Sequence, residues 1–299
     1  MKRIKFGRVF GAIVLMAVLS APSLSSAQAA NQAPADKTGK EALSLNNQGA
    51  ALALAGRYNE AVRFFQEALD RKPNFTMAHS NLGWAYQEMG AYEQAITAFQ
   101  KAIALNPRVG GYFVALGSCF FKLERHEEGL RAFRQAVRLN PRDAEAYSGL
   151  GATLLNFGDQ SGAVAALTKA LELKPDHPEA RANLGNAFVE ANKLAEARDE
   201  YLKVIKARPD HAEARNNLGA IYYRMKRYKE AAAELRKAVD LRPDSERAHY
   251  NLATVYLALN KREEALAEYR RLKDLNPDLA AVLFPSVYGD KILNVNSFR

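Results

Sequence analysis

Residues 76–109 read TMAHSNLGWAYQEMGAYEQAITAFQKAIALNPRV, and most of the chain repeats this pattern every 34 residues. The clearest marker is a proline near the end of each copy. It recurs as Pro73, Pro107, Pro141, Pro175, Pro209, Pro243 and Pro277. Counting from these prolines gives seven units without an insertion, at 42–75, 76–109, 110–143, 144–177, 178–211, 212–245 and 246–279. This period predicts a stack of repeats, because one short unit cannot bury its apolar face alone.

Within each unit, numbered 1 to 34, small and large residues recur at helical spacing. Positions 4, 7, 8 and 11 share one face of a first helix, and positions 20, 24 and 27 share one face of a second. Position 8 is glycine in six units and position 20 is alanine in six. We expect these small residues to let the two helices approach closely, with large residues at positions 11 and 24 beside the contact. The proline at position 32 ends the second helix.

These features resemble the tetratricopeptide repeat family over residues 42–279. Unit 2 carries the pattern in Asn81, Leu82, Gly83, Tyr86, Gly90, Tyr92, Ala95, Phe99, Ala102 and Pro107. The resemblance implies an all-α fold, a right-handed superhelical solenoid of seven antiparallel helix pairs. It also implies that the first helix of each pair lines a concave groove.

The remaining C-terminal residues, 280–299, are predicted to cap the last unit, because an open solenoid end exposes apolar surface. Leu279, Val282 and Leu283 fall at helical spacing, and Ile292, Leu293 and Val295 suggest a short extended piece. Docking of a partner on this tail is the alternative.

Residues 1–29 have the order of a secretory signal peptide. Four basic residues come first, an uncharged and mostly apolar run follows at 9–19, and Ala27-Gln28-Ala29 ends the segment. This order predicts cleavage and export, to the periplasm or outside the cell. The alternative is a membrane anchor at 9–19, although a bilayer span takes about 20 apolar residues. Residues 30–41 are polar, with Pro34 and Gly39, and predict a flexible linker.

Composition argues against an enzyme, a metal site or a cofactor site. The chain has 1 cysteine and 5 histidines, too few for thiolate zinc sites, and it has neither a phosphate-binding glycine loop nor a nucleophile elbow. The net charge of +9 includes four basic residues of the signal segment, so +5 would remain after cleavage. Because several Glu residues fall on the predicted groove, a nucleic-acid partner is not expected.

The predicted groove carries a repeated asparagine at unit position 6, where the core does not require one. Five units share it: Asn47, Asn81, Asn183, Asn217 and Asn251. A carboxamide both donates and accepts hydrogen bonds, so a row of them can bind an extended peptide backbone without selecting a side chain. The alternative is that each Asn only bonds the neighbouring turn.

Aromatic and acidic residues complete the predicted groove. Trp84 at position 9, and Phe121 and Tyr223 at position 12, are candidates to receive ligand side chains, with packing between helices as the alternative. Glu145, Glu179 and Glu213 at position 2 form an acidic band.

Together these features predict a non-enzymatic scaffold of the cell envelope that holds a partner protein or extended peptide, without a small-molecule cofactor. Membrane association is expected only if the signal segment stays uncleaved. One alternative is a protein that binds polysaccharide or peptidoglycan through aromatic residues. Another is a subunit that positions a separate catalytic chain.

Overall fold

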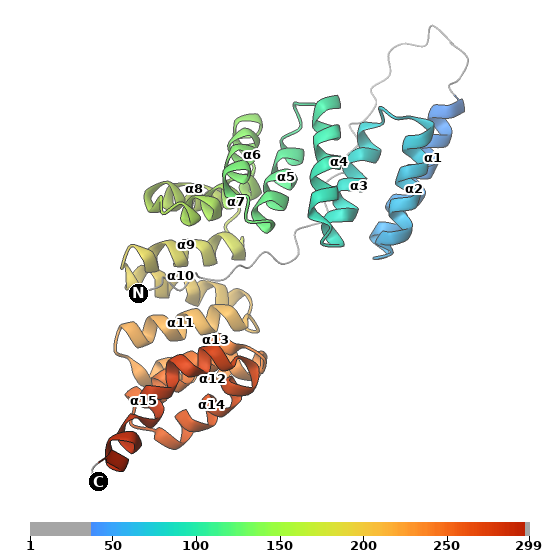
Figure 1. Ribbon diagram of the computed structural model, residues 1–299. Coiled ribbons are helices and arrows are strands. Elements are labelled where there is room, and N and C mark those ends of the chain that lie inside the picture. Colours follow the sequence, from blue (N-terminus) through green and yellow to red (C-terminus); the bar gives the residue numbers. More distant parts are fainter. Residues whose placement is uncertain (1–36, 297–299) are drawn as a thin grey trace. The chain divides into compact units, whose positions relative to one another are not determined.

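The computed structural model describes residues 37–296, with side chains described through residue 288, and these residues form fifteen helices (Figure 1). No β-strand occurs within the described range. The helices are α1 Lys37–Leu54, α2 Tyr58–Arg71, α3 Thr76–Glu88, α4 Tyr92–Leu105, α5 Gly110–Lys122, α6 His126–Leu139, α7 Ala144–Asn156, α8 Gln160–Leu173, α9 Pro178–Glu190, α10 Leu194–Ala207, α11 Ala212–Arg224, α12 Tyr228–Leu241, α13 Glu246–Ala258, α14 Arg262–Leu275 and α15 Pro277–Asn296.

The chain divides into two compact units after Phe157, with α1 to α7 in the first and α8 to α15 in the second. In the first unit α1 packs on α2, α3 on α4 and α5 on α6, and each second helix also packs on the next first helix. The second unit repeats this arrangement from α8 to α14. The predicted all-α repeat solenoid is therefore confirmed.

Short turns separate the two helices of each repeat, and one residue in each turn has a positive φ. Gly56, Gly90 and Gly158 adopt φ values of 73–74°, which glycine does without steric cost. Four non-glycine residues adopt the same conformation at φ 57–63°: Glu124, Asn192, Lys226 and Asn260. The turn is thus retained in unit 3 at Glu124 and in unit 6 at Lys226, where the sequence lacks a glycine or asparagine.

The position-8 glycines make room for the large side chain at position 24. A Cβ on Gly83 would lie 2.7 Å from Phe99 Cε1, and one on Gly185 would lie 2.8 Å from Tyr201 Cε2. The expected close approach is present. The space left by the glycine is filled by the ring of the second helix, which lies directly over it.

Two boundaries differ from the sequence prediction. Helix α1 begins at Lys37, so residues 37–41 are helical although they were predicted to be linker. Helix α15 continues through Pro285 to Asn296, so residues 292–295 are helical rather than extended. The predicted signal peptide, residues 1–29, lies outside the described residues.

The last helix covers the end of the repeat stack, as the capping tail was expected to do. Ala280, Leu283 and Val287 of α15 are buried against Leu266 and Leu272 of α14. Val282, which was expected to join this contact, is 64% exposed. The face of α15 that packs on the last repeat is therefore formed by residues 280, 283 and 287, which are three and four residues apart.

Candidate ligand-binding surface of the first helices

Part of the asparagine row bridges consecutive repeats. Asn81 Nδ2 on α3 donates to Asn46 Oδ1 on α1 at 3.0 Å. Asn251 Nδ2 on α13 donates to Asn216 Oδ1 on α11 at 2.9 Å. In both cases a position-6 carboxamide bonds a buried position-5 asparagine 35 residues earlier. These bonds join neighbouring first helices. The alternative in the sequence prediction was that each asparagine bonds only the neighbouring turn.

A longer polar network crosses α9 and α11 in the second compact unit, centred on Tyr201. The Tyr201 hydroxyl donates to Asn186 Oδ1 at 2.5 Å and accepts from Asn217 Nδ2 at 2.9 Å. Asn217 Oδ1 in turn accepts from Asn216 Nδ2 at 3.2 Å. Burial raises the pKa of Tyr201, so its hydroxyl remains a neutral donor. The network holds these carboxamides in fixed orientations.

Two members of the row keep their carboxamides available. Asn47 on α1 is exposed and Asn183 on α9 is half-buried. Neither side chain makes a hydrogen bond to another residue in the described part of the chain. Asn81, Asn217 and Asn251 are also half-buried, so their side chains retain contact with solvent. The row thus combines carboxamides that join repeats with carboxamides that are open to a ligand.

The aromatic candidates differ in exposure. Phe121 is only 7% exposed and packs edge-on against His126, which fits the packing alternative. Trp84 is half-buried, with its ring 5.3 Å from that of Phe99. Tyr223 is 37% exposed and lies 5.5 Å from Tyr228 between ring centroids. Of the three, Tyr223 presents the most surface to a ligand.

The acidic candidates are partly balanced by arginines. Glu179 on α9 pairs with Arg208 at 3.2 Å. Burial raises the pKa of Glu179, but the hydrogen bond with His177 and the charge of Arg208 outweigh it and bring the pKa down to about 2. Burial raises the pKa of Glu213 on α11 against the opposing charge of Arg247.

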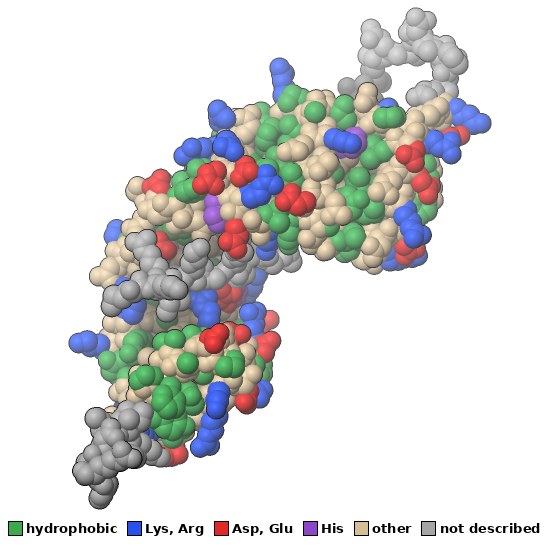
Figure 2. All heavy atoms as spheres, viewed as in Figure 1, with side chains coloured by type: hydrophobic (Ala, Val, Ile, Leu, Met, Phe, Trp, Pro, Cys, Tyr) green, Lys and Arg blue, Asp and Glu red, His purple; other side chains and the backbone are tan. Residues whose placement is uncertain are grey.

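Charge is mixed on a wider scale as well. Glu145 on α7, in the first unit, is half-buried. Acidic and basic side chains are interspersed over the face shown in Figure 2. Glu179 and Glu213 thus interact with Arg208 and Arg247, and the face visible in Figure 2 carries charges of both signs.

Sequence reasoning did not single out Tyr201, Asn46, Asn186 or Asn216. Tyr201 occupies position 24, where the other units have Phe, Leu or Tyr, and its hydroxyl emerges between two first helices. Comparing unit position 5 with position 6 of the next unit would have indicated these bridges. Asn46 and Asn216 are each followed by an asparagine 35 residues later.

Within the described part of the chain, no cluster of His, Cys, Asp or Glu side chains could hold a metal ion. Among the same residues, no helix has the length and apolar character needed to cross a bilayer. Cys119 is buried, and burial raises the pKa of its thiol to about 12, so it is a packing residue.

Several solved structures share this architecture. The APC/C hetero-tetramer Cut9-Hcn1 matches with a TM-score of 0.71 and 20% identity, over 83% of this chain and 48% of that chain. The present chain thus spans about half of that protein. A tetratricopeptide repeat protein from Parabacteroides merdae matches with a TM-score of 0.66 and 16% identity, over 83% and 99% of the two chains. PilF of Pseudomonas aeruginosa matches with a TM-score of 0.61 and 20% identity, over 68% and 92%.

Sequence models of protein families agree with the structural matches. The model of the cilia and flagella-associated protein 70 C-terminal domain, a tetratricopeptide repeat domain, matches residues 15–242. A second model, described as tetratricopeptide repeat, matches residues 222–283. No curated protein gives a match. The repeat register, the helix pairs and these matches agree, and the chain belongs to the tetratricopeptide repeat family.

Proposed function

We propose that this protein is a non-enzymatic scaffold that binds an extended segment of a partner protein along α9, α11 and α13. Tetratricopeptide repeats serve as interaction modules, and one similar structure, YrrB, is described as having an unusual peptide-binding site. The observation that carries the proposal is the set of carboxamides on these three helices. Hydrogen bonds hold those of Asn186, Asn217 and Asn251, and Asn183 makes none among the described residues.

Hydrogen-bond capacity supports a backbone ligand. Each carboxamide has two N–H donors and an acceptor oxygen. The Asn183 side chain uses neither its donors nor its acceptor within the described residues. The Asn251 side chain donates a single hydrogen bond, to Asn216. A peptide backbone offers donors and acceptors at regular spacing along an extended chain. Asn183 is free to pair with such a backbone, and Asn186 and Asn217, which the Tyr201 hydroxyl orients, can do so at a low ordering cost.

We further propose that the protein acts in the cell envelope after export. The support is the order of basic residues, apolar run and Ala27-Gln28-Ala29 at the start of the chain. N-terminal sequencing of the exported protein is expected to begin at Ala30. Recovery of Met1 in the envelope fraction would instead favour an anchor at 9–19.

The binding surface can be tested by site-specific photo-crosslinking in cells. A photoreactive residue is placed at Asn183 on the first-helix face of α9. The matched control is Leu202 on the adjacent second helix α10, which is 41% exposed. We expect a crosslinked partner from position 183 and none from position 202. A partner captured only from position 202 would contradict the proposed surface.

A further inference from the structure

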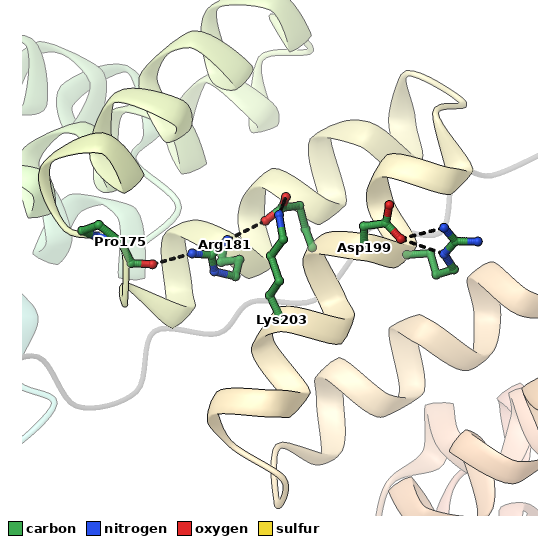
Figure 3. A network of polar contacts seen from close by, with 6 residues as sticks. Pro175, Arg181, Asp199 and Lys203 are labelled. Carbon is green, nitrogen blue, oxygen red and sulfur yellow. Dashed lines mark hydrogen bonds and ion pairs between the residues drawn. The ribbon is translucent and has the colours of Figure 1, made fainter.

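In each of the last three repeats, the side chain at unit position 4 contacts both the second helix and the turn that precedes the repeat. We call this pair of contacts the clasp. In unit 5, Arg181 Nη1 bonds Glu200 Oε2 at 2.9 Å while Arg181 Nη2 donates to the Pro175 carbonyl (Figure 3). In unit 6, Arg215 Nη1 bonds Glu234 Oε2 at 2.7 Å and Arg215 Nη2 donates to Pro209 O at 2.6 Å. Each clasp thus joins the first helix to the second helix and to the preceding turn.

In unit 7 a histidine takes the place of the arginine in the same two contacts. His249 Nδ1 lies 2.6 Å from Glu268 Oε2 on α14, and His249 Nε2 lies 3.0 Å from the Pro243 carbonyl oxygen. A carboxylate and a carbonyl both accept hydrogen bonds without donating. Both ring nitrogens must therefore carry a hydrogen, which only the imidazolium provides. An arginine makes both bonds at any physiological pH, whereas His249 makes them only when it is protonated.

Unit 2 offers an internal comparison at the same position. His79 Nε2 lies 2.8 Å from the Pro73 carbonyl oxygen. Position 23 of that unit is Ala98, which supplies no carboxylate to the other nitrogen. A neutral imidazole satisfies this single contact, because one N–H is sufficient. The need for a second proton is thus a feature of unit 7.

The surroundings of His249 favour its charged form. His249 is 4% exposed, and its hydrogen bond to Glu268 raises its pKa above 6.5 against the effects of burial and of the Arg271 charge. Both charged groups lie on α14, and the preceding turn contributes the Pro243 carbonyl. Helix α15 packs on α13 and α14 through apolar side chains, including Leu283 and Val287, and α11 and α12 also pack on α13.

We propose that His249 makes the C-terminal repeat a pH-sensitive segment. When His249 is protonated, α13 is held to α14 and to the turn at Pro243. When it loses its proton, one of the two bonds is lost and the remaining lone pair faces an oxygen atom. Repeat 7 then loosens, and with it the Asn251–Asn216 bridge on the first-helix face. This inference rests on the fold and does not depend on the proposed ligand.

The direction in which stability changes with pH follows from the raised pKa of His249. The stabilisation is complete below about pH 6.5, the usual pKa of histidine, and is lost as the pH rises through the higher pKa of the folded protein. His249→Arg restores the arginine of units 5 and 6 and should remove the dependence. The matched control is His79→Gln, because the unit 2 contact needs a single donor.

The test is hydrogen exchange of residues 246–288 in the full chain, measured by mass spectrometry from pH 5.5 to 8.5. At each pH the exchange rate of the wild type is divided by that of His249→Arg, which cancels the intrinsic effect of pH. We expect a ratio near one at pH 5.5 that rises about 2- to 10-fold at pH 8.5, the equivalent of one hydrogen bond. In the His79→Gln background the same rise is expected. A ratio that does not change with pH would overturn the proposal.

A second measurement on the wild type does not depend on any variant. An NMR titration of the imidazole nitrogens is expected to show both His249 nitrogens protonated at pH 6. A neutral His249 tautomer at that pH would overturn the inference.

Discussion

The side-chain amide of Asn251 donates a hydrogen bond to Asn216 Oδ1, 2.9 Å away and 35 residues earlier in the chain. Asn216 is 5% exposed, so this bond spans two neighbouring first helices in a largely buried position. The same pairing joins Asn81 to Asn46 in the first compact unit. Part of the asparagine row therefore joins successive repeats.

Replacing Asn216 with Ala should destabilise the second unit by about 0.5–1.5 kcal/mol, because Asn251 loses its acceptor. Urea unfolding followed by circular dichroism measures this change. Asn183→Ala is the control and should leave stability unchanged, since Asn183 has no side-chain bond among the described residues. Equal losses in both variants would argue against a specific bridging role.

Replacing Gly83 with Ala should cost about 1–3 kcal/mol of stability, because its Cβ would lie 2.7 Å from the Phe99 ring. Gly111→Ala is a matched control on α5, where a Cβ would meet no atom within 4 Å. There the better helix former should stabilise the protein by up to about 1 kcal/mol. Thermal melting of the two variants should therefore shift in opposite directions.

Replacing Leu283 with Ala should destabilise the C-terminal repeat by about 2–5 kcal/mol, because Leu283 is 3% exposed in the contact between α15 and α14. Val282→Ala, one residue earlier on the same helix and 64% exposed, should change stability by less than about 0.5 kcal/mol. Hydrogen exchange in α13 and α14 reports both effects. Comparable exchange in the two variants would contradict the capping role of α15.

Helix α11 should lose its N-terminal cap at low pH. His211 Nδ1 accepts from the Ala214 amide at 3.1 Å, and burial together with the Arg208 charge lowers the pKa of His211 below 6.5. The cap is complete above pH 6.5 and is lost as the pH falls through the lowered pKa. His211→Ser, which copies the Ser245 cap of α13, should remove this acid sensitivity. The difference between wild type and variant in the free energy of unfolding from urea titrations, about 1 kcal/mol at most, should appear only at acid pH.

The repeat register and the packing at Gly83 and Phe99 could be predicted from the sequence, because the period places small and large residues on fixed helix faces. The path of α15 could not. Pro285 favours a break, but burial of Val287 beside Leu283 continues the helix beyond it. The helical start at Lys37 was also missed, because a polar stretch with Gly39 has the composition of a linker.

The candidate surface was predictable in part. Unit position 6 identified the asparagines, but not whether each one faces a ligand or a neighbouring repeat. That depends on the residue one helix away, such as Asn216 for Asn251 or the Tyr201 hydroxyl for Asn217. Nor did position 12 show that Phe121 would be only 7% exposed, with His126 edge-on to its ring.

The most direct test of the scaffold account is the affinity of the crosslinked partner for wild type and for Asn183→Ala. Asn183 is chosen over Asn217 because the Asn217 side chain also holds Tyr201. Titration calorimetry should show binding weakened by about 0.5–1.5 kcal/mol in Asn183→Ala with an unchanged melting temperature. Leu202→Ala should bind as the wild type does. Unchanged affinity in Asn183→Ala, together with a loss in Tyr223→Ala, would contradict a carboxamide surface for peptide and favour an aromatic glycan site.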